Sequence, residues 1–226
     1  MSKQIVVCGD SFCSASTSLP GTHFSEIIND TTDYTVINLA RGGISNIGIC
    51  FQLEQAVKLK ANIVILGQTI ADRIDIPSGH TKFCPALGLK NIAYTYESDS
   101  STGSEYVGNE NAAIYSDMIY NFIGNGRLDK TWTITEQQRL ALEHYVAYLH
   151  NKEFKETTDG WALGYWINLL KSYGALVIEL NKGLGQELYD AYTTNPAYFH
   201  KVSYHTDTQT QERVAKRLIE YIKKHE

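Results

Sequence analysis

Three short apolar runs, each followed by a glycine-containing turn, constrain the fold of this chain more than any other feature. The runs cover Gln4–Cys8, Tyr34–Leu39 and Asn62–Leu66. Between them lie Thr22–Asn29, with apolar residues at helical spacing, and a second such segment that Ser45 or Asn46 can cap. Short continuous apolar runs are typical of strands buried on both faces of a parallel sheet, and the helices form the crossovers. The pattern therefore predicts an α/β fold.

The carboxyl-terminal part returns to the same pattern after an irregular middle. Apolar spacing predicts helices over Glu136–Leu149, Trp161–Leu170 and Thr208–Lys223, and a strand over Ala175–Leu180. Residues 77–111 show no clear period, and we expect a helix over 112–123. We expect a flavodoxin-like three-layer sandwich with about five parallel strands. Residues 1–226 would form one domain that carries an insertion over about 77–160.

Composition narrows the class of protein and its partners. The chain has 226 residues, a net charge of −5 and a hydrophobic fraction of 43%, which suits a globular protein. It contains no block of Lys and Arg, which disfavours nucleic acid as a partner, and no apolar run long enough to cross a membrane. The four cysteines form no C-x-x-C pair and are expected to be reduced thiols. With no apolar leader at the start, we expect a cytoplasmic location.

Polar residues follow the predicted strands at the point where each strand ends. The turns are Gly9-Asp10-Ser11, Arg41-Gly42-Gly43 and Gly67-Gln68-Thr69. In an open α/β sheet these turns meet in a crevice at the carboxyl edge, and the closing helix brings His205 to the same edge. Ser11 is then a candidate nucleophile and His205 its general base. The backbone N–H groups of Ser11 and Gly43 are candidate donors to an oxyanion.

These turns resemble the sequence blocks of the SGNH (GDSL-like) hydrolases. Gly9-Asp10-Ser11-Phe12 is similar to the nucleophile block, and Asn38–Gly43 is similar to the second block, whose glycine donates to the oxyanion hole. Gly67-Gln68-Thr69 stands where the third block has G-x-N, and His205 resembles the catalytic histidine of the last block. The blocks occur in family order and span nearly the whole chain. The resemblance implies a Ser-His centre with Ser11, Gly43 and Thr69 around the oxyanion.

Two positions depart from the family pattern. Thr69 replaces the third-block asparagine, and its hydroxyl reaches less far than a carboxamide. Val202 stands three residues before His205, where the family has an aspartate. The chain would then use a Ser-His dyad, with a backbone carbonyl or a carboxylate from elsewhere orienting the imidazole. Asp207 is the acidic residue nearest in sequence.

Several candidate residues also have a structural interpretation. The Asp10 carboxylate can accept backbone N–H groups and hold its turn. Either Asp207 or Thr208 can cap the closing helix, and Thr208-x-x-Gln211 has capping-box spacing. Arg73 can pair with Asp75 or meet an anionic group of a substrate.

Other histidines and cysteines offer alternative chemistry. His200 is the second candidate for the base, and Cys13 is a lesser candidate nucleophile. His200, His205 and Asp207 could be read as metal ligands, but their spacing falls on a non-helical stretch, so we expect no metal. We expect no organic cofactor either.

The favoured function is a serine esterase or acyl hydrolase that acts on a small acyl or ester substrate. The alternative is a non-catalytic binding or structural protein on the same scaffold, which Val202 and Thr69 motivate. A nucleotide-binding flavodoxin-like domain is disfavoured because the chain has neither a G-x-G-x-x-G nor a Walker-type loop. The sequence does not indicate the substrate or the oligomeric state.

Overall fold

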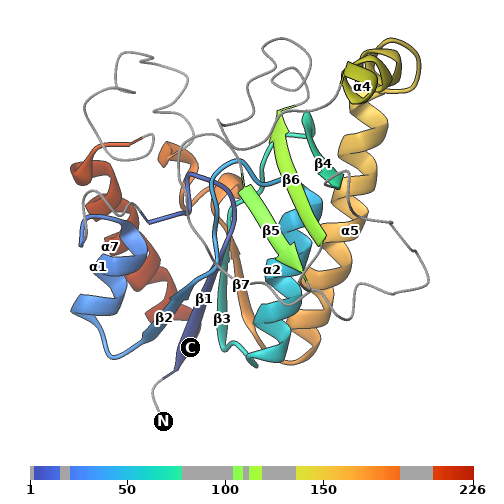
Figure 1. Cartoon of the computed structure of the whole chain (residues 1–226). Coiled ribbons are helices and arrows are strands. Elements are labelled where there is room, and N and C mark those ends of the chain that lie inside the picture. Colours follow the sequence, from blue (N-terminus) through green and yellow to red (C-terminus); the bar gives the residue numbers. More distant parts are fainter. Residues whose placement is uncertain (1–2, 16–20, 78–103, 109–111, 119–135, 189–205) are drawn as a thin grey trace. The chain divides into compact units, whose positions relative to one another are not determined.

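The computed structural model describes residues 3–15, 21–77, 104–108, 112–118, 136–188 and 206–226 (Figure 1). Internal contacts divide the chain into two compact units. The first unit comprises 1–41, 49–69 and 161–226, and the second comprises 42–48 and 70–160. The second unit overlaps the expected insertion at about 77–160. That the whole chain forms one domain stays a prediction.

The first unit contains a parallel sheet of four strands in the order β2-β1-β3-β7. The strands are β1 (Gln4–Cys8), β2 (Thr35–Asn38), β3 (Ile63–Leu66) and β7 (Leu176–Glu179). The pairing sets Val7 opposite Asn38, Cys8 opposite Leu66, and Leu66 opposite Glu179. All four strands therefore end at the same edge, and the predicted parallel α/β architecture is confirmed.

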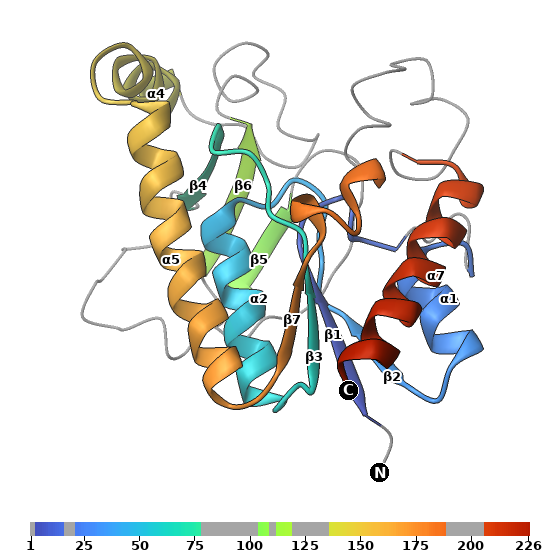
Figure 2. The same cartoon turned by 180° about the vertical axis from the view of Figure 1, so that it is seen from behind.

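Helices cover both faces of this sheet, as the two opposite views show (Figures 1 and 2). The helices α1 (Phe24–Thr31) and α7 (Thr208–His225) pack on one face, and α2 (Asn46–Lys58) and α5 (Lys152–Ser172) lie on the other. Ile5 and Val7 belong to the apolar cluster beneath α1 and α7. Successive side chains of a strand point to opposite faces, so the buried Val6 between them faces the other layer.

Side-chain caps begin the helices where the sequence places polar residues. Ser45 Oγ accepts a hydrogen bond from the Gly48 N–H at 3.0 Å, which confirms Ser45 as a cap of α2. Asn151 Oδ1 accepts from Phe154 N–H at 2.8 Å, so α5 begins at Lys152 rather than at Trp161. Each cap satisfies an N–H group that has no partner within its helix.

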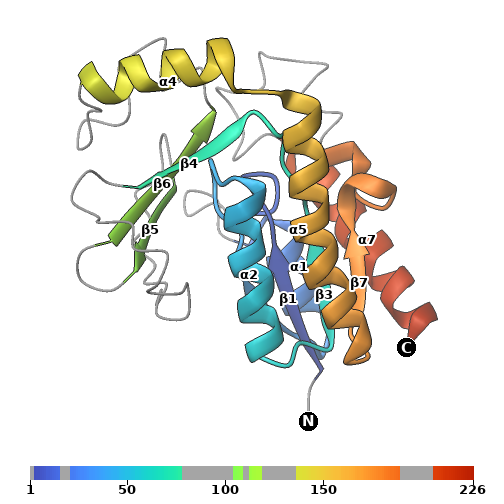
Figure 3. The same ribbon diagram turned by 90° about the vertical axis from the view of Figure 1, so that its right-hand side faces the viewer.

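The second unit contains an antiparallel sheet that the sequence patterns did not reveal (Figure 3). Its strands are β4 (Arg73–Pro77), β5 (Ser104–Gly108) and β6 (Ala112–Met118), in the order β4-β6-β5. The predicted helix over 112–123 is therefore wrong in its first part. β6 pairs with β4 on one side and β5 on the other, and this pairing decides a segment whose local pattern is ambiguous. The predicted helix at Glu136–Leu149 is confirmed as α4 (Glu136–Tyr148).

Within the described ranges, no helix is both long and apolar enough to cross a bilayer. Three of the cysteines, Cys8, Cys13 and Cys50, are buried free thiols, as predicted. Burial raises the pKa of the Cys8 thiol, because a thiolate loses its hydration there. Cys84 lies outside the described residues.

Candidate active site

The turns after β1, β2 and β3 meet at the carboxyl edge of the parallel sheet. The Arg41 N–H donates to the Gly9 carbonyl at 3.0 Å, and the Gly67 N–H donates to the Cys8 carbonyl at 2.9 Å. Backbone bonds thus tie the turn that carries Ser11 to both neighbouring loops. The sequence predicts this convergence, and these contacts confirm it for the part of each loop that belongs to the first unit.

Ser11 lies in a tight turn that Asp10 closes. The Cys13 N–H donates to the Asp10 carbonyl at 3.0 Å, and the Phe12 N–H donates to Asp10 Oδ1 at 3.0 Å. Asp10 is buried, and Ser11 is 6% exposed. The carboxylate holds the turn by accepting a backbone N–H two residues ahead, which confirms the structural interpretation of Asp10.

Gly9 begins the turn in a conformation that suits glycine alone. Its φ is +155°, and a Cβ atom there would lie 2.7 Å from Cys13 Sγ and 2.8 Å from the Gly67 carbonyl oxygen. Gln52 of α2 holds the same residue. The Gly9 N–H donates to Gln52 Oε1 at 2.6 Å, and Gln52 Nε2 donates back to the Gly9 carbonyl at 3.3 Å.

Gln52 is a residue of this site that the sequence motifs do not indicate. Its signal is a polar residue between Phe51 and Leu53, and it is buried. Buried amides need hydrogen-bond partners, so a glutamine at such a position predicts a polar contact. The partner could not be inferred from a distance of 43 residues along the chain.

Asn38, the last residue of β2, contacts two of the loops. Its Nδ2 donates to the Cys13 carbonyl at 2.8 Å and to Ser25 Oγ at 3.0 Å. Its Oδ1 accepts from the Ala40 N–H at 2.9 Å. The amide orientation is consistent, because a flipped carboxamide would set its oxygen against the Cys13 carbonyl.

His23 caps α1 beside the same turn. Its Nδ1 lies 2.8 Å from Ser25 Oγ, and its Nε2 faces the Phe12 carbonyl at 3.5 Å. His23 is 5% exposed, and burial lowers the pKa of its imidazole to about 4. The Phe12 carbonyl opposes this shift of the pKa, because it favours a protonated ring. The neutral ring therefore accepts at Nδ1 and carries its proton on Nε2.

The third loop is held by contacts at the end of β7. Gln68 Nε2 donates to Glu179 Oε2 at 2.9 Å, and Lys182 Nζ lies 2.6 Å from the same oxygen. Thr69, the next residue, is half-buried and belongs to the first unit. Its role at an oxyanion stays a prediction.

At the start of the closing helix, the structure separates two roles that the sequence left open. Asp207 is the N-cap of α7, and its Oδ1 accepts the Thr210 N–H at 2.6 Å. This bond lowers the pKa of Asp207, because it stabilises the carboxylate. The predicted capping box from Thr208 to Gln211 is wrong. Gln211 is turned inward, where its Oε1 accepts the Phe24 N–H at 2.9 Å.

His205 lies outside the described residues, as do His200 and Val202. The assignment of His205 as the base therefore stays a prediction. Thr206 is the first described residue after it, and its hydroxyl accepts a hydrogen bond from Gln211 Nε2. Thr206, the residue directly after His205, is therefore both buried and hydrogen-bonded.

Gly43 and Arg73 belong to the second unit, and their roles at the site stay predictions. Gly43 has a φ of +79°, which favours glycine. Arg73 begins β4, and its buried Nε has no hydrogen-bond partner among the described residues. The structure does not describe the side chain of Asp75, the expected partner of Arg73.

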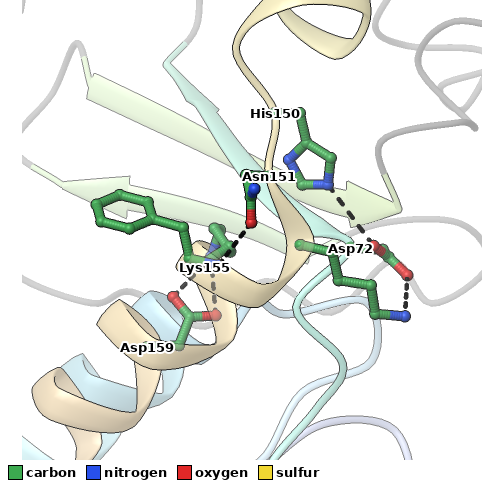
Figure 4. A network of polar contacts seen from close by, with 7 residues as sticks. Asp72, His150, Asn151, Lys155 and Asp159 are labelled. Carbon is green, nitrogen blue, oxygen red and sulfur yellow. Dashed lines mark hydrogen bonds and ion pairs between the residues drawn. The ribbon is translucent and has the colours of Figure 1, made fainter.

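Beside Arg73, Asp72 takes part in a polar network of the second unit (Figure 4). Asp72 Oδ2 accepts from Lys152 Nζ at 3.2 Å, and Asp72 Oδ1 lies 3.7 Å from His150 Nε2. Nearby on α5, Lys155 Nζ contacts both oxygens of the buried Asp159, at 2.7 and 2.8 Å. The contact of Lys152 with Asp72 joins the start of α5 to the residue before β4, and the pair of Lys155 and Asp159 lies within α5.

The first unit also has a hollow of about 440 Å³ beside β7 and α7. It is lined by Val177, Ile178, Glu179, Lys182, Gly183, Leu184, Arg217 and Tyr221. The lining includes none of the site residues that the sequence predicts. In the part of the chain that the structure describes, no three His, Cys, Asp or Glu residues gather as metal ligands would.

No family model and no curated protein matches this sequence. Solved structures resemble the chain over nearly its full length at low identity. The esterase EstA from a Pseudoalteromonas species is 10% identical with a TM-score of 0.41, covering 98% of this chain and 97% of that chain. A lipolytic protein of the G-D-S-L family from Desulfitobacterium hafniense is 12% identical with a TM-score of 0.37, covering 96% and 97%. The lipase/acylhydrolase from Enterococcus faecalis is 14% identical with a TM-score of 0.35, covering 99% and 96%.

Proposed function

We propose that this protein is a serine hydrolase that cleaves an ester or acyl group, with Ser11 as the nucleophile. The observation that carries the proposal is the turn of Ser11 at the carboxyl edge of the sheet. Asp10, Gln52 and Asn38 hold this turn through five hydrogen bonds given above, which involve Gly9, Phe12 and Cys13. A rigid turn of this kind suits a nucleophile, because the attacking oxygen must be held in place before reaction.

In the proposed reaction, Ser11 Oγ attacks the carbonyl carbon of the substrate. His205 takes the hydroxyl proton as the new bond forms and then donates it to the leaving alcohol. The oxyanion that develops accepts hydrogen bonds from the N–H groups of Ser11 and Gly43 and from Thr69. A water molecule, activated by His205, then hydrolyses the acyl-enzyme and restores Ser11. These steps need only groups of the chain and water.

Two features support a small, uncharged acyl group as the substrate. The chain carries a net charge of −5, so it does not attract an anionic polymer. Ser11 is only 6% exposed, which favours a small reacting group over a bulky one at this atom.

A serine-directed fluorophosphonate probe tests the proposal together with hydrolysis of p-nitrophenyl acetate. We expect the purified wild type to react with the probe at Ser11, as located by mass spectrometry, and to cleave the ester. Ser11→Ala should abolish both activities. Ser172→Ala is the matched control, because Ser172 is an exposed serine near the end of α5.

The rival function, a non-catalytic binding protein, predicts a different result. Val202 occupies the position of the expected acid, and such a protein would not need one. If the folded wild type neither reacts with the probe nor cleaves any short acyl ester, the hydrolase proposal is overturned and the binding protein is favoured.

A further inference from the structure

The side chains behind the Ser11 turn form a directed chain of hydrogen bonds. Asn38 Nδ2 donates to Ser25 Oγ at 3.0 Å, and Ser25 Oγ lies 2.8 Å from His23 Nδ1. A serine hydroxyl has one proton. Because the Asn38 amide donates to Ser25, the serine proton is directed to the unprotonated Nδ1 of His23. The proton of His23 then lies on Nε2, which faces the Phe12 carbonyl at 3.5 Å.

Both ends of this series of hydrogen bonds lie on the turn that carries Ser11. One end is the contact of His23 with the Phe12 carbonyl, and the other is the 2.8 Å bond from Asn38 Nδ2 to the Cys13 carbonyl. These are the two carbonyls directly after Ser11 in the sequence. His23 and Ser25 are buried, so water does not compete for these groups.

The same carboxamide also holds the second loop. Asn38 Oδ1 accepts the Ala40 N–H at 2.9 Å, and the next residue, Arg41, donates its N–H to the Gly9 carbonyl at 3.0 Å. Two contacts therefore hold the second loop to the Ser11 turn: the bond from Asn38 Nδ2 to the Cys13 carbonyl and the bond from the Arg41 N–H to the Gly9 carbonyl. Only the first is made by a side chain, so a conservative substitution can remove it.

We propose that Asn38 is a positioning residue for Ser11, because its carboxamide joins the turn of the nucleophile to the loop that leads to Gly43. This inference rests on the proposed function. Asn38 does not touch the reacting atoms. It holds the turn of Ser11 against the start of the second loop, at residues 38–41, and Ser25 with His23 holds the carboxamide in its orientation. A displacement of about 1 Å in such an arrangement can slow a reaction about 100-fold.

Asn38→Asp is the sharpest test, because it preserves size and replaces the two N–H donors of the amide with an acceptor. We expect kcat for p-nitrophenyl acetate to fall about 10- to 100-fold with little change in KM, because geometry at the reacting atom is lost. The rate of reaction with the fluorophosphonate should fall by a similar factor. Asn62→Asp is the matched control. Asn62 is exposed, its Oδ1 accepts the Gln4 N–H at the amino edge, and aspartate preserves that acceptor.

Ser25→Ala is the second variant, since a carboxylate beside the Cys13 carbonyl can destabilise the fold. It removes the hydroxyl that links His23 to Asn38 and leaves the bond from Asn38 to Cys13 in place. We expect a smaller fall in kcat, about 3- to 10-fold, with unchanged KM. If either variant folds and both kcat and the labelling rate equal those of the wild type, the positioning role is overturned.

Hydrogen exchange separates this inference from the proposed function. In Asn38→Asp, the amides of residues 12 and 13 should exchange faster than in the wild type, because the turn loses its bond from Asn38 Nδ2, while those of β3 keep their protection. If the wild type is catalytically inert, the proposed function fails, and this measurement alone decides whether Asn38 holds the two loops. If exchange at these amides is unchanged, Asn38 does not position the turn. If the wild type reacts at Ser11 and the variants react equally fast, the positioning role fails and the proposed function stands.

Discussion

Nδ1 of His23 lies 2.8 Å from Oγ of Ser25, and both residues are buried behind the turn that carries Ser11. The contact requires a neutral imidazole, since the serine donates to Nδ1. Burial lowers the pKa of His23 from 6.5 to about 4, because a buried imidazolium loses its hydration. The Glu26 carboxylate is near, but it accepts the backbone N–H of His23 at 3.1 Å rather than a ring proton.

This contact predicts how stability depends on pH. Between pH 6.5 and about pH 4, the unfolded chain binds a proton on His23 that the folded protein excludes. The free energy of unfolding therefore has its full value above pH 6.5. It falls as the pH is lowered towards 4, by about 3 kcal/mol in total. We expect urea unfolding of His23→Gln to show a shallower fall than the wild type over this range. Parallel curves for the two proteins would contradict a buried, neutral His23.

Gly9→Ala should destabilise the fold, because its Cβ atom would lie 2.7 Å from Cys13 Sγ at a φ of +155°. We expect a loss of about 2–4 kcal/mol in the free energy of unfolding, from strain and overpacking together. Gly164→Ala is the matched control, because no atom lies within 4 Å of a Cβ there and the site is inside α5. That variant should gain about 0.5–1 kcal/mol. Equal stabilities of the two variants would show that the turn is less tight than described.

Thr69→Val tests the third donor to the oxyanion. Valine has the shape of threonine without the hydroxyl, and losing one oxyanion donor typically lowers kcat about 100-fold. We expect that fall in the hydrolysis of p-nitrophenyl acetate, measured on folded protein. Thr157→Val, at an exposed position of α5, is the control. A Thr69→Val enzyme with the kcat of the wild type would leave the oxyanion to backbone donors alone.

Asp207 variants distinguish a helix cap from a catalytic acid. Because Asp207 Oδ1 accepts the Thr210 N–H, Asp207→Ala should lose about 1 kcal/mol of stability, while Asp207→Asn preserves the cap. Both variants should keep the kcat of the wild type. Thermal unfolding and steady-state kinetics measured together decide this. A tenfold or larger fall in kcat for Asp207→Asn, with normal stability, would instead make Asp207 the group that orients His205.

The parallel core could be predicted from the sequence because its signals are local. The apolar runs of β1 and β3 are buried on both faces, and α7 presents Val214, Leu218 and Ile222 to the core at helical spacing. The same local logic identified Asp10 as the residue that closes its own turn. The strand β6 escaped prediction, because its hydrogen bonds go to β4 and β5 rather than to neighbours in the chain.

By itself, the sequence determined the strand–helix order of the first unit and the candidate residues at strand ends, since hydrophobic period and turn chemistry act over a few residues. Only the tertiary structure decided what holds Ser11. Gln52 reaches Gly9 across 43 residues and Asn38 reaches Cys13 across 25, and no local pattern encodes either pairing. Hydrogen bonds between buried polar groups form only after the sheet and helices have packed, so their partners are a property of the fold.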